Sequence, residues 1–269
     1  MTRPRSATSS RARLARQRAR MPHRGRSRRV ALVTGAARGI GAATVRALSA
    51  AGWNVVAVDL AGDDPALPYA LGTAAELQAL ANERTVTLPV DVRDVEALAG
   101  AVEVAERRWG GLDAVIAAAG VIAGGAPAWE LDPALERAVL AVDLGGVLNA
   151  ARAGVPALLR RPEPREGRFV AVGSAATRGL AAYSAATAGV SGFVRALAVD
   201  LGGTGVTANA VAPGPTRTAL LDERARLHGL PAGPALEPEE VAALIVWLAS
   251  PESRGATGAT FPLDGGLAR

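Results

Sequence analysis

Three glycines near the start of the chain have the spacing of a loop that binds the phosphates of a dinucleotide. They lie in the segment V-T-G-A-A-R-G-I-G, residues 33 to 41, where an apolar run ends and an amphipathic run begins. Glycine is needed where the chain turns tightly, where the backbone approaches a pyrophosphate and where a helix meets a strand. Gly35, Gly39 and Gly41 can fill these roles, and the N-terminus of the next helix would then face the phosphates.

An acidic residue at the end of the next apolar run supports this interpretation. Asp59 follows Gly41 by 18 residues, where a carboxylate can accept hydrogen bonds from the adenosine ribose. It would repel a 2′-phosphate, whereas the guanidinium of Arg38 could accept one. We expect NAD rather than NADP, because Asp59 lies where the ribose itself should be. On these residues alone, a methyltransferase remains an alternative, since that class also uses a glycine loop and an acid after the second strand.

The elements that must position these residues are visible as alternating short apolar and longer amphipathic runs. Continuous apolar strands are buried on both faces, which predicts a parallel sheet covered by helices on each side. The predicted fold is a single Rossmann-type, doubly wound α/β sheet, in one NAD-binding oxidoreductase domain over residues 30–269. Strands are expected at 30–33, 55–58, 85–90, 112–117, 168–172, 206–211 and 259–263, and helices at 40–51, 94–108, 133–160, 183–201 and 238–249.

Composition limits the other possibilities. The net charge of +5 comes from residues 1–29, which contain 11 arginines and no acid, so the rest of the chain is mildly acidic. This Arg-rich tail is expected to be disordered; nonspecific contact with nucleic acid or anionic lipid is the alternative. With no cysteine and two histidines, we expect no metal site. The sequence shows neither a membrane span nor a secretory signal, and a cytoplasmic location is expected.

Further motifs give the chain a specific resemblance. T-G-x-x-x-G-I-G at 34 to 41 resembles the short-chain dehydrogenase/reductase family, and the similarity runs from about Val30 to Gly266. Asp91-Val92 resembles the pair that contacts adenine in the family, A-A-A-G stands at 117 to 120, and P-G-P-T-R-T at 213 to 218 resembles the loop beside the nicotinamide. Ser174 follows the fifth strand and Tyr183 opens the next helix, an order that a methyltransferase has no reason to carry. The cofactor-binding residues predicted in this way are Gly35, Arg38, Gly39, Ile40, Gly41, Asp59, Asp91, Val92, Ala118, Gly120, Tyr183, Pro213, Gly214, Thr216 and Thr218.

The resemblance implies a reaction that interconverts an alcohol and a carbonyl compound. In the family, tyrosine transfers a proton to or from the substrate oxygen, serine hydrogen-bonds that oxygen, lysine holds the nicotinamide ribose and lowers the tyrosine pKa, and asparagine connects a water relay. Ser174 and Tyr183 match the first two. Thr187 replaces the lysine and Asp143 replaces the asparagine.

These replacements weaken the expected proton relay. Thr187 lies one helical turn after Tyr183 and supplies a hydroxyl but no charge. The chain contains no lysine at all, so Arg178 is the nearest cation the sequence offers. Asp143, if ionised near Tyr183, would raise the tyrosine pKa; a surface or capping carboxylate is equally consistent with the sequence. We therefore expect slow turnover that favours carbonyl reduction. The alternative is a catalytically silent NAD-binding protein, a sensor or an oligomer partner.

The segment after Asp59 is longer than is usual in the family. This insertion, D-L-A-G-D-D-P-A-L-P-Y-A-L-G-T-A-A-E-L, is similar to that of the mycofactocin-associated subfamily. The resemblance implies tightly held NAD that an external carrier, mycofactocin, re-oxidises. An ordered insertion over the adenosine end would slow cofactor exchange, whereas a mobile surface loop would not.

Two further expectations concern the substrate and the assembly. Apolar residues at Val121, Trp129 and Leu220 suit a hydrophobic alcohol or ketone, although apolar residues are equally expected in the core. Small residues along 181–192 suit the helix contacts of a homodimer or homotetramer, or packing inside one subunit.

Overall fold

Seven strands of the computed structural model form one sheet, in the order β3-β2-β1-β4-β5-β6-β7. Every neighbouring pair is parallel. The structure describes residues 28–175, 179–228 and 235–266. The strands are β1 (Val30–Thr34), β2 (Asn54–Asp59), β3 (Thr85–Pro89), β4 (Ala114–Ala117), β5 (Arg168–Val172), β6 (Thr207–Pro213) and β7 (Thr260–Leu263).

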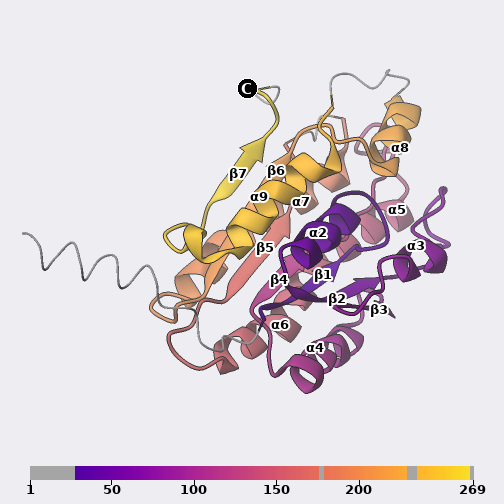
Figure 1. The fold of residues 1–269 in the computed structure, drawn as a ribbon. Coiled ribbons are helices and arrows are strands. Elements are labelled where there is room, and N and C mark those ends of the chain that lie inside the picture. Colours follow the sequence, from indigo (N-terminus) through magenta and orange to yellow (C-terminus); the bar gives the residue numbers. More distant parts are fainter. Residues whose placement is uncertain (1–27, 176–178, 229–234, 267–269) are drawn as a thin grey trace, which may run out of the picture.

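The strand order creates a crevice at the centre of the sheet. From β1 the chain proceeds outward to β2 and β3, and then crosses back to β4 on the other side of β1. Loops that leave the carboxyl ends of β1 and β4 therefore separate, and this is where open α/β sheets bind ligands. Figure 1 shows the strands fanning between two helical layers.

Alternation along each buried strand divides the core between the two faces of the sheet. Leu32 belongs to the core under α4, α6 and α7, whereas its neighbour Val33 belongs to the core under α2 and α9. The predicted doubly wound fold with helices on both faces is confirmed. The helices are α2 (Gly39–Ala50), α3 (Ala74–Gln78), α4 (Val95–Trp109), α5 (Pro133–Val139), α6 (Gly146–Arg160), α7 (Ala181–Asp200), α8 (Ala219–His228) and α9 (Pro238–Ala249), with a π-helical turn η1 (Leu140–Gly145) and a 3-10 turn η2 (Pro251–Ser253).

The long helix predicted at 133–160 is a continuous helical run, but its centre is π-helical rather than α-helical. Between α5 and α6, the turn η1 is π-helical over Leu140–Gly145. Contrary to the expectation from the sequence, the run Pro133–Arg160 is long and apolar enough to cross a membrane, but 56% of its most apolar window is buried inside the protein. It packs on β4 and α4, so it is a core helix.

The domain boundary remains a prediction. Of the tail at 1–29, only Arg28 and Arg29 are among the described residues. The described chain from Val30 onward forms the one sheet, which agrees with a single domain over residues 30–269.

Candidate active site

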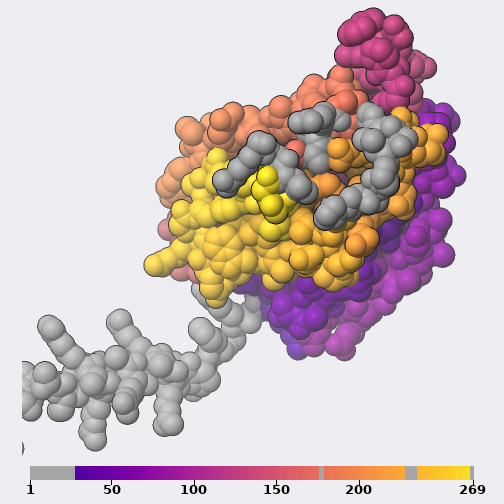
Figure 2. Space-filling model, turned by 90° about the horizontal axis from the view of Figure 1, so that it is seen from above, coloured from indigo at the N-terminus to yellow at the C-terminus, as the bar shows by residue number. Residues whose placement is uncertain are grey.

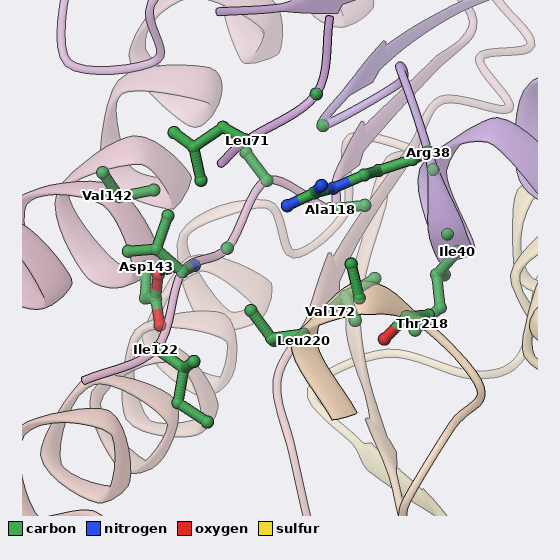
Figure 3. A pocket seen from close by; sticks show the side chains of 18 of the residues that line it. Arg38, Ile40, Leu71, Ala118, Ile122, Val142, Asp143, Val172, Thr218 and Leu220 are labelled. Atoms are coloured by element: carbon green, nitrogen blue, oxygen red, sulfur yellow. Dashed lines mark hydrogen bonds between the residues drawn. The ribbon is translucent and has the colours of Figure 1, made fainter. Parts of the chain in front are cut away.

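One cavity at the carboxyl ends of the strands brings the predicted site residues together. Every residue assigned to the cofactor from the sequence lines it, and so do Ser174, Thr187 and Asp143. Its empty space is about 1500 Å³, which includes the open solvent at its mouth. In Figure 3 the cavity extends from one end at Arg38, Ile40 and Thr218 to another at Val142, Asp143 and Ile122.

The glycine loop has a backbone that strongly disfavours other residue types. Gly35 and Gly39 have φ angles of 66° and 57°, in the left-handed region that side chains disfavour. A Cβ atom on Gly41 would lie 1.9 Å from the carbonyl oxygen of Gly35. No side chain caps the start of α2, so its first N–H groups are available to a phosphate. This cradle fits the pyrophosphate of a dinucleotide.

Asp59 is held at the end of β2 by two backbone donors. Its Oδ2 accepts from the N–H of Ala37 at 3.0 Å and its Oδ1 accepts from the N–H of Ala61 at 3.1 Å. A carboxylate oxygen has a further lone pair, so Asp59 can still accept from ribose hydroxyls in the cavity that it lines. The guanidinium of Arg38 donates to the carbonyl oxygen of Ala70 at 3.0 Å. The carboxylate of Asp59 is thus held where it would repel a 2′-phosphate, and the guanidinium of Arg38 is held by Ala70. This arrangement favours NAD over NADP.

The insertion after β2 is packed over this end of the cavity. Leu67 is buried, and Leu71 and Gly72 line the cavity wall. Asp64, which is 5% exposed, pairs with Arg93 after β3 at 2.6 Å. The structure thus favours an ordered insertion over a mobile surface loop.

Tyr69 of the insertion also reaches the far side of the cavity. Its hydroxyl accepts a hydrogen bond from the N–H of Ile122 at 2.7 Å, which joins the insertion to the loop after β4. Burial raises the pKa of Tyr69 above its usual value. Tyr69 was not among the residues predicted from the sequence; the available signal was that it is the one aromatic residue of the insertion.

Ser174, Tyr183 and Thr187 lie together on the cavity wall. Ser174 and Tyr183 share a side-chain hydrogen bond. Thr187 is 7% exposed, and its hydroxyl donates back to the carbonyl oxygen of Tyr183 at 2.9 Å within α7. The hydroxyl hydrogen of Thr187 is therefore already used within the helix. Its oxygen can still accept a hydrogen bond from a group in the cavity.

The surroundings of Tyr183 favour the neutral phenol. Burial, followed by the negative charge of Asp143, raises the pKa of Tyr183 to about 12; the Ser174 hydrogen bond and the charge of Arg224 oppose this in part. At neutral pH, Tyr183 is a proton donor rather than a base.

Asp143 is neither a surface nor a capping residue, so that alternative from the sequence is wrong. The π-helical turn η1 directs it inward, where it is 6% exposed. Its Oδ1 accepts from the N–H of Val121 at 2.8 Å, and its Oδ2 has no partner among the described residues. Burial raises the pKa of Asp143 well above its usual range, and the Val121 hydrogen bond offsets only part of that effect.

One expectation from the sequence stays untested and another needs correction. Arg178 lies outside the described residues; within them, the cation that acts on Tyr183 is Arg224 of α8, which was not among the predicted residues. Val121 and Leu220 line the cavity, but Trp129 does not, and it is 84% exposed. It lies in the segment between β4 and α5, whose magenta chain projects from the body in Figure 2.

Asp143→Asn is expected to raise the free energy of unfolding above that of the wild type, and by more at about pH 9 than at about pH 5. In the unfolded chain, aspartate ionises near its ordinary pKa of about 4, whereas folded Asp143 stays protonated to higher pH. Between the two pKa values unfolding releases a proton, so the wild type loses up to about 1.4 kcal/mol of stability per pH unit. Asparagine at this position still accepts from the N–H of Val121, but it does not titrate. The variant therefore lacks this loss of stability with rising pH. Denaturant unfolding at several pH values measures the difference, and a stability gain that does not grow with pH would contradict it.

Comparison with known proteins gives a consistent set of relatives. A family model described as Enoyl-(Acyl carrier protein) reductase matches residues 35–268. Cis-4-hydroxycyclohexanecarboxylate dehydrogenase of Sinomonas cyclohexanicum is 38% identical, over 88% of this chain and 96% of that protein.

Two solved structures with bound NAD superpose on most of the chain. Carveol dehydrogenase from Mycobacterium avium in complex with NAD has a TM-score of 0.82 at 32% identity and covers 88% of this chain and 96% of its own. A short chain dehydrogenase from Mycobacterium paratuberculosis bound to NAD has a TM-score of 0.79 at 31% identity, over 90% of this chain and 98% of its own.

Proposed function

This chain belongs to the short-chain dehydrogenase/reductase family and is an NAD-dependent oxidoreductase acting on alcohols and carbonyls; from that premise we propose that it works mainly as a carbonyl reductase whose NAD stays bound between turnovers. The observation that carries the direction is Tyr183, a neutral phenol beside Ser174 with Thr187 in the place of the lysine.

The residues of the cavity provide a place for each part of the cofactor. We assign the pyrophosphate to the backbone of the loop from Gly35 to Gly41, the adenosine ribose to Asp59, and the nicotinamide to the segment 213–218. The cradle that only glycine can form and the two N–H donors that hold Asp59 support this assignment. When bound, NAD supplies the hydride in reduction or accepts it in oxidation.

Tyr183 and Ser174 would act on the substrate oxygen. Ser174 hydrogen-bonds the carbonyl oxygen and orients it, and Tyr183 donates its proton as negative charge develops there. Neutral phenol is the form this step needs, so a pKa of about 12 does not hinder it. Oxidation needs the phenolate, which is scarce at neutral pH. Thr187 supplies no charge to lower that pKa, and Arg224 offsets only part of the loss.

The packed insertion supports retention of the cofactor. Tyr69 joins the insertion to Ile122, and Asp64 joins it to Arg93, so the cavity wall near Asp59 is tied to two other loops. Both contacts must break before this wall can move aside. Slow exchange of NAD would require an external carrier that exchanges electrons with the bound cofactor. In carbonyl reduction the reduced form of the carrier would convert bound NAD back to NADH, and mycofactocin is the carrier we propose. A cytoplasmic location and a homodimer or homotetramer remain predictions.

The test is to purify the full chain and analyse it for NAD by absorbance and mass spectrometry, then to measure both directions at neutral pH with an added artificial electron carrier. We expect co-purified NAD and reduction of ketones or aldehydes that exceeds oxidation of the matching alcohols. Bound NAD without turnover in either direction would instead identify the silent NAD-binding protein, and absence of NAD binding would contradict both functions.

A further inference from the structure

Helix α8 carries a positive charge that faces the cavity without an acidic partner. Arg224 is partly buried and lines the same cavity as Ser174 and Tyr183. Two residues later, Arg226 donates to both carboxylate oxygens of Glu223, at 2.5 and 2.8 Å, and Glu223 is only 7% exposed. The buried acid of α8 is therefore already paired, and within the described chain no hydrogen bond or ion pair joins Arg224 to a carboxylate.

The other acids that line the described cavity are also engaged. Asp64 and Asp91 both bind Arg93, and Asp59 accepts from backbone N–H groups. Asp143 is buried and its Oδ1 accepts from the N–H of Val121, and among the described residues no ion pair joins it to Arg224. Thus none of these acids neutralises Arg224.

Apolar side chains line the same cavity as this arginine. They are Val121, Ile122, Val142, Leu220 and Leu221. Burying an unpaired guanidinium among apolar side chains costs free energy, and pairing it with an anion offsets that cost. Its charge also acts on Tyr183, so the anion it attracts lies near the group that contacts the substrate oxygen.

We propose that Arg224 binds a carboxylate of the substrate, which makes the substrate pair an apolar oxo acid and its hydroxy acid rather than a neutral ketone and alcohol. This inference rests on the proposed function. The carboxylate is unchanged in the reaction; the carbonyl carbon gains a hydride from NADH and the oxygen gains a proton from Tyr183. The apolar wall contacts the carbon skeleton between the two polar groups, and the guanidinium fork holds the carboxylate at a fixed orientation.

The first test compares 4-oxocyclohexanecarboxylate with its methyl ester as substrates for the full-length protein. In the wild type, kcat/KM for the acid should exceed that for the ester by about 10- to 100-fold, since a charge-assisted contact is lost in the ester. Arg224→Gln should abolish that preference by raising KM for the acid far more than for the ester. Arg226→Gln is the matched control on the same helix, because glutamine still donates to Glu223 and residue 226 does not line the cavity.

A binding measurement separates this inference from the proposed function. Calorimetric titration of the NAD complex with cyclohexanecarboxylate and with cyclohexanecarboxamide needs no turnover, and only the wild type and Arg226→Gln should prefer the carboxylate. The inference is overturned if the acid and ester are reduced equally well, if Arg224→Gln weakens both ligands alike, or if it weakens NAD instead, which would assign Arg224 to the cofactor. Carboxylate-selective binding without reduction would uphold Arg224 and contradict the proposed reductase.

Discussion

Tyr183→Phe is expected to lower the rate of carbonyl reduction by about 10²- to 10⁴-fold, the usual contribution of a positioned general acid. Phenylalanine keeps the ring that fills this wall of the cavity and removes only the hydroxyl that Ser174 hydrogen-bonds. The fold and the affinity for NAD should therefore be nearly unchanged. Rates of carbonyl reduction with an added artificial electron carrier, together with the NAD content of the purified protein, measure both quantities.

Ser174→Ala is the matched control for this change. It leaves the proton donor in place and removes one hydrogen bond to the substrate oxygen, so its loss of rate should be smaller than that of Tyr183→Phe. If Tyr183→Phe retains the wild-type rate while it binds NADH, another group donates the proton, and our assignment of Tyr183 fails.

Thr187→Lys is expected to raise the rate of alcohol oxidation at neutral pH by about 10- to 1000-fold. A positive charge within a few ångströms of a phenol lowers its pKa by about one to three units, and the phenolate fraction at neutral pH rises by the same factor. The position suits the change, because Thr187 lies one turn after Tyr183 and lines the cavity into which a longer side chain can extend. Reduction should change far less, since it uses the neutral phenol.

The pH dependence of oxidation shows whether charge is the cause. With the pKa of Tyr183 at about 12, wild-type oxidation should rise about tenfold per pH unit through the neutral range. In Thr187→Lys this rise should level off at lower pH. Thr187→Met, with similar length and no charge, should behave like the wild type. An unchanged oxidation profile in a folded Thr187→Lys protein that binds NAD would refute the electrostatic explanation.

The parts of the site that were predictable from the sequence are those set by local chain geometry. Gly35, Gly39 and Gly41 sit in a strand-turn-helix unit whose residues lie close together in the chain, and Asp59 ends the very next strand. Such units impose a glycine or an acid at fixed spacing, so the pattern alone indicates which backbone must form. The buried strands were equally readable, because continuous apolar runs leave few alternatives for a parallel sheet.

What the sequence could not reveal depends on contacts between distant segments. Arg224 lines the cavity from α8, and Tyr69 of the insertion bonds Ile122 in the cavity wall, but no spacing relates either residue to Tyr183. The inward direction of Asp143 follows from a π-helical turn that has no clear pattern of its own. Trp129 was misassigned because an apolar residue type does not indicate which way its loop projects, and the loop in question projects from the body of the protein (Figure 2).

The position of the tyrosines gives the molecule a built-in optical probe. The chain contains two tyrosines: Tyr183 lines the cavity, and Tyr69 accepts from the N–H of Ile122, a residue that lines it. Their pKa values are both raised, so the ultraviolet band of tyrosinate has no background from ordinary surface phenols. Alkaline difference spectra of this protein thus report on Tyr183 and on the contact between the insertion and the loop after β4, without any label.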